Sequence, residues 1–315
     1  MSKQPILDVI TYGEAMAMFV AAETGNLSEI THFTKRVAGA ELNVATGLAR
    51  LGFKVAWLSR VGNDSFGQFI LQQLAKENIH HDCVSIDPHY PTGFQLKAKA
   101  EQGTDPAVEY FRKGSAASYL SLADFTPAPF LNARHLHLSG VAAALSDSSY
   151  RLSLHLIDFM RTAGKTISFD PNLRPTLWKS EQEMVRSLNQ LASKADWVLP
   201  GIKEGRILTG LRAAEAIADF YLEKGVKAVI IKLGEQGAYF KDHQGNQDTI
   251  PPCPVEKIVD TVGAGDGFAV GVISALLEGK TLIQAAKRGN RIGSLAIQVI
   301  GDSEGLPTRE QLGAF

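Results

Sequence analysis

A glycine-rich turn that opens a long apolar stretch carries the strongest chemical signal in the sequence. The turn runs from Asp260 to Asp266 as DTVGAGD, and the apolar run FAVGVISALL follows it. Glycines at the start of a helix let successive backbone N–H groups point at one spot, where the helix dipole also favours negative charge. The Asp266 carboxylate would stand beside the bound anion as a base. An anion site next to a base is what phosphoryl transfer requires.

Short β-branched runs alternate with longer helical patterns, and these elements would position the turn. The strand-like runs end at or near Gly13, Gly62, Gly140, Asp170, Gly201 and Gly234. This alternation predicts an α/β fold with a parallel sheet covered by helices on both faces. Ligands of such sheets bind at the carboxyl ends of the strands. The run VEKIVD, residues 255–260, is expected to be a further strand that leads into the turn.

Two segments interrupt the alternation. Residues 15–37 and 92–113 each have strand-like flanks around a Gly-containing turn. We expect them to pair in space as one small β-sheet that forms a lid over the ligand site; two separate surface hairpins are the alternative. The rest of the chain, residues 1–14, 38–91 and 114–315, would then form one α/β catalytic domain.

Composition excludes several classes of protein. The 315 residues include 32 Lys and Arg against 33 Asp and Glu, so the net charge of −1 argues against a general nucleic-acid binder. The two cysteines form neither a disulfide framework nor a zinc spacing, which favours a reducing compartment. The first residues lack the apolar core of a signal peptide, and no apolar stretch is long enough to cross a bilayer. We therefore expect a cytoplasmic protein with no membrane partner.

Two motifs resemble a known family. DTVGAGDGFAVGVI resembles the C-terminal signature of the PfkB, or ribokinase-like, family of sugar kinases, and AGAELNVATGLARLGFKVAWLSRVG resembles the N-terminal signature. The resemblance implies a ribokinase-like three-layer α/β sandwich with a mostly parallel central sheet and a small β-sheet lid. It also implies phosphoryl transfer from ATP, accompanied by Mg²⁺, to a hydroxyl of a small-molecule sugar.

The resemblance also assigns roles to individual residues. Asp266 would take the proton of the attacking hydroxyl, while the N–H groups of Gly263, Ala264 and Gly265 hold the developing charge. Gly39 and Asn43 would contact sugar hydroxyls. Glu204 stands where many members order magnesium indirectly through an Asn-x-x-Glu motif, although Gly201 replaces the Asn here. The residues implied around the nucleotide are Asn172, Lys232, Gly234, Gly237, Gly263 and Gly265.

Further positions resemble the branch of the family that phosphorylates 2-keto-3-deoxygluconate. They are Tyr110 and Arg112 in VEYFRKGSAAS, Arg174 in SFDPNLRPTLW and Asp302 in GDSEGLP, all implied to touch the substrate together with Asp266. A sugar acid carries a carboxylate, which arginine binds through bidentate, charge-assisted hydrogen bonds. Gln95 departs from this branch, which usually has an aromatic residue there. We therefore expect ATP-dependent phosphorylation of the 6-hydroxyl, giving 2-keto-3-deoxy-6-phosphogluconate.

Alternatives remain open at this point. Within the family, the chain could be a fructokinase or a 5-keto-2-deoxygluconate kinase, because DPNLRPTLW also occurs in those branches. Outside catalysis, a sugar sensor on the same fold is disfavoured, because a sensor would be free to lose Asp266. We also expect a homo-oligomer built through the lid, since isolated two-stranded ribbons are marginal in water.

Overall fold

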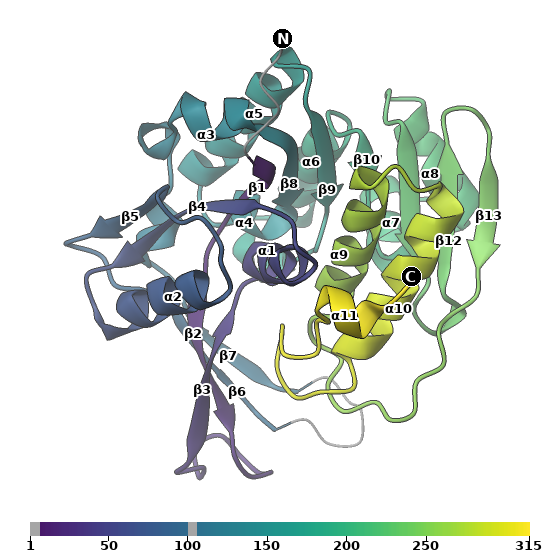
Figure 1. Ribbon diagram of the computed structural model, residues 1–315. Helices are drawn as coiled ribbons and strands as arrows, with labels where there is room; N and C mark the ends of the chain where they lie inside the picture. The colour runs from purple at the N-terminus through teal and green to yellow at the C-terminus, as the bar shows by residue number, and fades with distance from the viewer. Residues whose placement is uncertain (1–6, 100–105) are drawn as a thin grey trace.

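A nine-stranded, mostly parallel sheet runs through the centre of the molecule (Figure 1). The computed structural model describes residues 7–99 and 106–315, so the parts of the expected segments 1–14 and 92–113 that cover residues 1–6 and 100–105 lie outside the described residues. The strands, in spatial order, are β13 (Gln247–Ile250), β12 (Ala238–Asp242), β11 (Ala228–Lys232), β10 (Trp197–Val198), β9 (Thr166–Asp170), β8 (Ala133–Ser139), β1 (Leu7–Tyr12), β4 (Val55–Gly62) and β5 (Val84–Asp87). From β11 to β5 all neighbours are parallel, whereas β12 and β13 are antiparallel.

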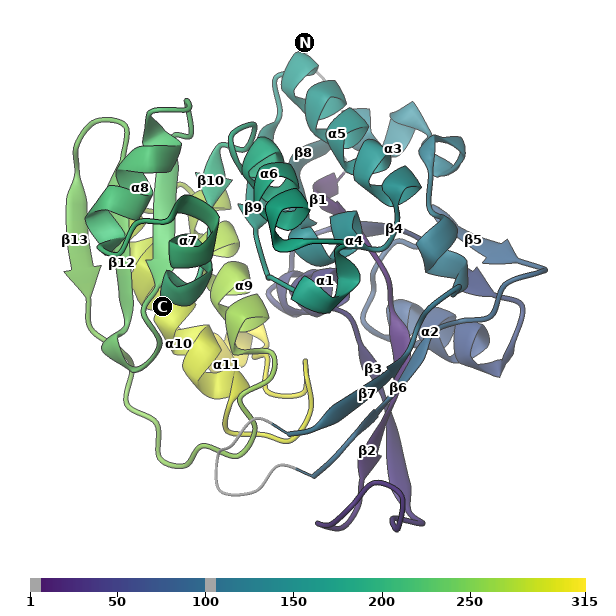
Figure 2. The same cartoon turned by 180° about the vertical axis from the view of Figure 1, so that it is seen from behind.

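Helices cover both faces of this sheet, as Figures 1 and 2 show from opposite sides. One face carries α1 (Ala40–Arg50), α2 (Ser65–Lys76), α9 (Ala264–Leu277), α10 (Leu282–Ala296) and α11 (Arg309–Leu312). The other carries α3 (Pro127–Asn132), α4 (Gly140–Ala144), α5 (Asp147–Thr162), α6 (Glu181–Ala192), α7 (Ile202–Thr209) and α8 (Ala214–Leu222). Successive residues of β1 pack on opposite faces of the sheet. Val9 joins the core on the side of α1 and α9, and Ile10 and Tyr12 join the core on the side of α5 and α6. None of the described helices has the length and apolar character needed to cross a membrane.

A second sheet of four strands extends from the edge of the large sheet at which the parallel strands end (Figure 1). Its strands, in spatial order, are β3 (Phe33–Ala38), β2 (Met16–Ala21), β6 (Phe94–Lys97) and β7 (Val108–Phe111). The hairpins β2–β3 and β6–β7 are antiparallel, and β2 joins β6 in parallel. The two segments that interrupt the α/β alternation therefore form one sheet. The three-layer sandwich with a small second sheet that the sequence predicts is confirmed.

The expectation of a strand at residues 255–260 is wrong. This segment belongs to no strand of either sheet. The antiparallel hairpin of β12 and β13, which directly precedes this segment in the chain, already forms this end of the large sheet. The N–H groups of Val259 and Asp260 instead donate to the carbonyl of Ile297, at the end of α10, at 2.8 and 3.2 Å.

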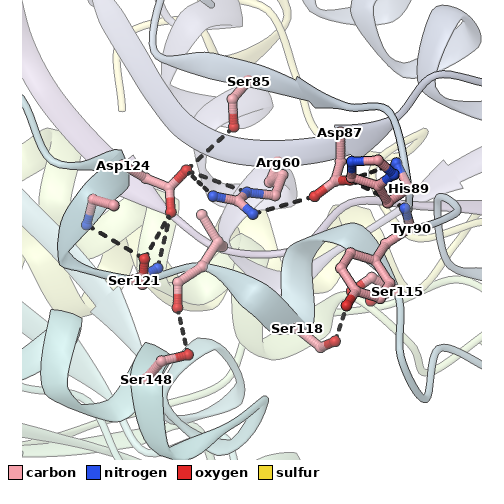
Figure 3. A network of polar contacts seen from close by, with 12 residues as sticks. Arg60, Ser85, Asp87, His89, Tyr90, Ser115, Ser118, Ser121, Asp124 and Ser148 are labelled. Carbon is pink, nitrogen blue, oxygen red and sulfur yellow. Dashed lines mark hydrogen bonds and ion pairs between the residues drawn. The ribbon is translucent and has the colours of Figure 1, made fainter.

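A charged network joins the segments that precede and follow the β6–β7 hairpin of the small sheet (Figure 3). Arg60, near the end of β4, donates to Asp87 at 3.2 Å and to Asp124 at 2.7 Å. Asp87 ends β5 just before the chain enters β6, and Asp124 lies in a 3₁₀ turn after β7. Asp87 also accepts the N–H groups of His89 and Tyr90. One guanidinium therefore connects the segment before the β6–β7 hairpin to the 3₁₀ turn that follows it.

We expect Arg60→Met to destabilise the fold by leaving two buried carboxylates without their shared cation. The side chain of Arg60 is 22% exposed. The loss in free energy of unfolding should therefore be about 1–2 kcal/mol, below the ~3–5 kcal/mol for a fully buried pair. Urea denaturation measures it. Lys179→Met is the control, because Lys179 and Asp147 form an exposed ion pair, and it should show no measurable change. Equal losses in the two variants would contradict the prediction.

Candidate active site

The turn before α9 has a backbone conformation that glycine alone adopts easily. Gly263 is the N-cap of α9 and has a φ of +84°, in the left-handed region. A Cβ atom at this position would also collide with the backbone carbonyl of Asp302. The turn thus packs tightly against the 301–302 segment and leaves the first N–H groups of α9 without helical partners. These groups and the helix dipole can hold an anion at the place that the sequence predicts.

Asp266 lies in the first turn of α9, where side chains from two other elements hold it. Asn43, on α1, donates its Nδ2 to Oδ2 of Asp266 at 2.8 Å, and Asn172, after β9, donates to Oδ1 at 3.3 Å. Burial raises the pKa of Asp266 to about 7; the hydrogen bond from Asn43 opposes this shift and the nearby Asp170 carboxylate adds to it. The carboxyl group is therefore poised to exchange a proton near neutral pH.

A lysine stands beside the same helix N-terminus. Lys232, at the end of β11, donates its Nζ to Asp170 Oδ2 at 2.6 Å. Burial lowers the pKa of Lys232, but the carboxylates of Asp170 and Glu204 outweigh burial and raise that pKa above its usual value. A Cβ atom on Gly265 would lie 3.6 Å from Nζ. A charged ammonium therefore lies next to the open N–H groups of α9.

Two cavities meet at this point. One, of about 460 Å³, lies between the large sheet and the small sheet and has Asp266 in its wall. The other, of about 470 Å³, lies between the 234–237 turn, α9 and α10 and has Phe268 and Ile258 in its wall. Lys232 and Gly265 line both cavities. The arrangement suits transfer of an anionic group from a molecule in one cavity to a molecule in the other.

All residues implied as site residues by the sequence line one of these cavities. The first is lined by Gly39, Asn43, Tyr110, Arg112, Asn172, Arg174, Glu204, Lys232, Gly263, Gly265, Asp266 and Asp302. The second is lined by Lys232, Gly234, Gly237, Ala264 and Gly265. Asn172, implied near the phosphates, lines the first cavity beside Asp266, as Gly263 does, and its part in nucleotide binding stays a prediction.

The two arginines lie in different surroundings. Arg112, after β7, donates its Nε to Glu14 at 2.7 Å, and its Nη2 also pairs with that carboxylate. Arg174 is exposed, and its Nη1 donates to the carbonyl of Leu173. Glu14 was not singled out from the sequence, although it directly follows the predicted strand end at Gly13. Its carboxylate fixes one edge of the Arg112 guanidinium and leaves Nη1 for another partner.

No described group of three His, Cys, Asp or Glu side chains could hold a metal ion. Both carboxylate oxygens of Glu204 accept backbone N–H groups, from Leu173 at 2.8 Å and from Gly201 at 2.6 Å. Glu204 therefore caps α7 and braces the segment that carries Asn172. Its predicted indirect part in magnesium binding would have to work through water.

Comparison with known proteins defines the class of enzyme. Residues 7–309 match the family model described as pfkB family carbohydrate kinase. The chain thus belongs to this family of kinases, and the family resemblance seen in its motifs is confirmed.

Individual relatives resemble it over nearly their whole length. The chain is 52% identical, over 310 residues, to a 2-dehydro-3-deoxygluconokinase of Bacillus subtilis strain 168; the match covers 98% of this chain and 95% of the relative. A PfkB protein from Polaromonas sp. JS666 superposes with a TM-score of 0.91 at 50% identity, covering 98% and 100% of the two chains. A putative ribokinase II from E. coli, solved in complex with ATP and Mg²⁺, superposes with a TM-score of 0.90 at 26% identity, covering 98% of each chain.

Replacing Asp266 should remove the base with little change in shape. We expect Asp266→Asn to lower kcat by about 10²–10⁴-fold, the usual contribution of a general base. For the wild type, kcat/KM should fall as the pH drops below about 7, because protonation of Asp266 removes the same base. Steady-state kinetics from pH 5 to 9, with thermal melting as the control for folding, tests both. An Asn variant that kept more than half of the wild-type kcat would rule out this role.

Proposed function

We propose that the protein transfers the γ-phosphoryl group of ATP to the 6-hydroxyl of 2-keto-3-deoxygluconate, giving 2-keto-3-deoxy-6-phosphogluconate. The similarity to the Bacillus subtilis relative supports this choice of substrate. The observation that carries the proposal is that Asp266, Arg112 and Arg174 line a single cavity. A base and two cations around one space suit a substrate that has a hydroxyl to activate and a carboxylate to bind.

The sugar acid fits the first cavity in one orientation. Its 6-hydroxyl would lie against Asp266, and its carboxylate would lie toward Arg112, whose Nη1 the Glu14 contact leaves available. Gln95, on β6, is buried in the cavity wall, and its Oε1 has no hydrogen-bond partner within the described part of the chain. A buried acceptor that lacks a donor favours a ligand that brings a hydroxyl group to it.

ATP fits the second cavity. Apolar side chains such as Phe268 and Ile258 suit the adenine ring, while Gly234 and Gly237 let the backbone approach closely. The phosphates would then reach the α9 N-terminus and the Lys232 ammonium. Magnesium would arrive with the nucleotide, would be held near Glu204 through water, and would offset the negative charge of the phosphates.

The residues that line the two cavities can supply each step of the transfer. Asp266 accepts the proton of the 6-hydroxyl as its oxygen attacks the γ-phosphorus. The bond from that phosphorus to the bridging oxygen breaks, and ADP leaves with the electron pair. The N–H groups of Gly263, Ala264 and Gly265 stabilise the charge on the transferred group. Because Asp266 titrates near neutral pH, it can release the proton again before the next turnover.

The carboxylate should decide which sugar the protein prefers. Because Arg112→Ala alone would leave the buried Glu14 carboxylate without its cation, we combine it with Glu14→Gln. Each charge-assisted hydrogen bond is worth roughly 1.5–3 kcal/mol, so the double variant should lose about 10–10²-fold in kcat/KM on the acid and much less on fructose. A coupled ADP-release assay with both sugars on both proteins measures this. Fructose turning over as well as the acid in the wild type would indicate the fructokinase alternative.

We also propose that the small sheet joins two copies of the chain. Its edge strand β7 leaves Tyr110 and Phe111 about half exposed. An uncovered edge strand with exposed aromatic side chains is a surface that another chain can cover. A dimer, or an assembly of dimers, should therefore appear in light scattering at micromolar concentration, and Phe111→Asp should shift it toward the monomer mass. A monomeric wild type under these conditions would contradict this proposal.

A further inference from the structure

A buried ion cluster joins the small sheet to the anion-binding turn at the wall of the first cavity. It consists of Lys97 on β6, Asp260 at the start of the turn and Asp302 on the C-terminal segment. The Lys97 ammonium lies 2.7 Å from Asp260 Oδ2 and 2.9 Å from Asp302 Oδ1. The side chains of Lys97, Asp260 and Asp302 are 1%, 0% and 7% exposed. Three segments that are distant in the sequence thus meet at one charged centre.

Asp260 connects this centre to the turn. Its Oδ1 accepts the N–H of Val262 at 3.1 Å, and its Oδ2 accepts the N–H of Gly301 at 3.2 Å. Val262 directly precedes Gly263, the N-cap of α9. The Asp260 carboxylate therefore holds the turn and the 301–302 segment in one arrangement. A change in the position of this carboxylate would move the N–H groups that face the anion.

Lys97 belongs to the small sheet, whereas Asp260 and Asp302 lie outside that sheet. It ends β6, in register with Val20 of β2 and Val108 of β7, so the small sheet holds it from both sides. The carboxylates of Asp260 and Asp302 need this cation, because two buried carboxylates close together repel each other. Without it, the site would also present two negative charges near the place where a phosphoryl group must pass.

We propose that Lys97 is a positioning residue that acts through Asp260: it fixes the anion-binding turn in its active shape and does so only while the small sheet is docked. The small sheet thus closes one cavity and, through one side chain, also completes the anion site at the junction of the two. This inference rests on the proposed function, because it takes the α9 N-terminus as the site of the transferred phosphoryl group.

The experiment compares neutral variants of Lys97 with a matched control. In Lys97→Ala and Lys97→Gln, kcat should fall by about 10²–10³-fold, the cost of a misplaced oxyanion donor. The KM for ATP should stay within about threefold, since Lys97 does not line the second cavity. Lys99→Ala is the control: Lys99 lies two residues on, and its Nζ donates to the carbonyl of Ala22. It should behave as the wild type does.

Chemical rescue separates the charge from a merely structural role. Methylammonium should raise the kcat of Lys97→Ala at least about tenfold and leave the wild type and Lys99→Ala unchanged, because only the Ala variant offers an empty cation site. Lys97→Arg, which keeps the charge but not the shape, should be more active than Lys97→Gln. If Lys97→Ala does not fold, as judged by circular dichroism, Lys97→Gln decides.

Two results would overturn the inference. One is a folded Lys97→Gln with kcat within about threefold of the wild type, and the other is a folded Lys97→Ala that methylammonium does not restore. Wild-type turnover of 2-keto-3-deoxygluconate tests the proposed function separately. If another sugar proves to be the better substrate, the same comparison is made on that sugar.

Discussion

The hydrogen bond from Asn43 to Asp266 joins the two halves of the sequence that the chemistry needs. Asn43 lies on α1 and Asp266 on α9, more than two hundred residues apart, and the helices lie side by side on one face of the sheet. Burial alone would favour the protonated carboxyl group. The amide donor counters this preference, so that the base can ionise near neutral pH. The packing of α1 against α9 is therefore a requirement of the site as well as of the fold.

The sequence was sufficient to predict the parallel strands from β11 to β4, because they are β-branched runs separated by amphipathic helices. The strands β5, β12 and β13 were not predicted from it. The sequence was also sufficient for the small sheet, since its hairpins break that alternation. The prediction of a strand at residues 255–260 failed. VEKIVD has the composition of a strand, but the hairpin of β12 and β13 already forms that end of the sheet. Pairing partners are a property of the whole fold, and a local run of residues does not contain them.

The place of the candidate site could be predicted where a motif carried it, because Gly263 and Asp266 lie in the wall of one cavity. Lys97 and Glu14 could not be predicted in the same way. Each is a single charged residue in or near a strand, and its meaning depends on a partner far along the chain: Asp260 for Lys97 and Arg112 for Glu14. At Asn172 the family resemblance implied a place near the phosphates, and the structure shows in addition that its amide donates to Asp266.

The two cavities share Lys232 and Gly265, so the places proposed for the two reactants adjoin at these residues. A single compound that carried an adenosine at one end, a sugar acid at the other and a phosphate chain between them would occupy both cavities at once. Once one end is bound, the other is held near its cavity at an effective concentration on the order of millimolar. Such a bisubstrate ligand would bind more tightly than either half alone. The length of its phosphate chain would measure the separation of the two reactants in solution.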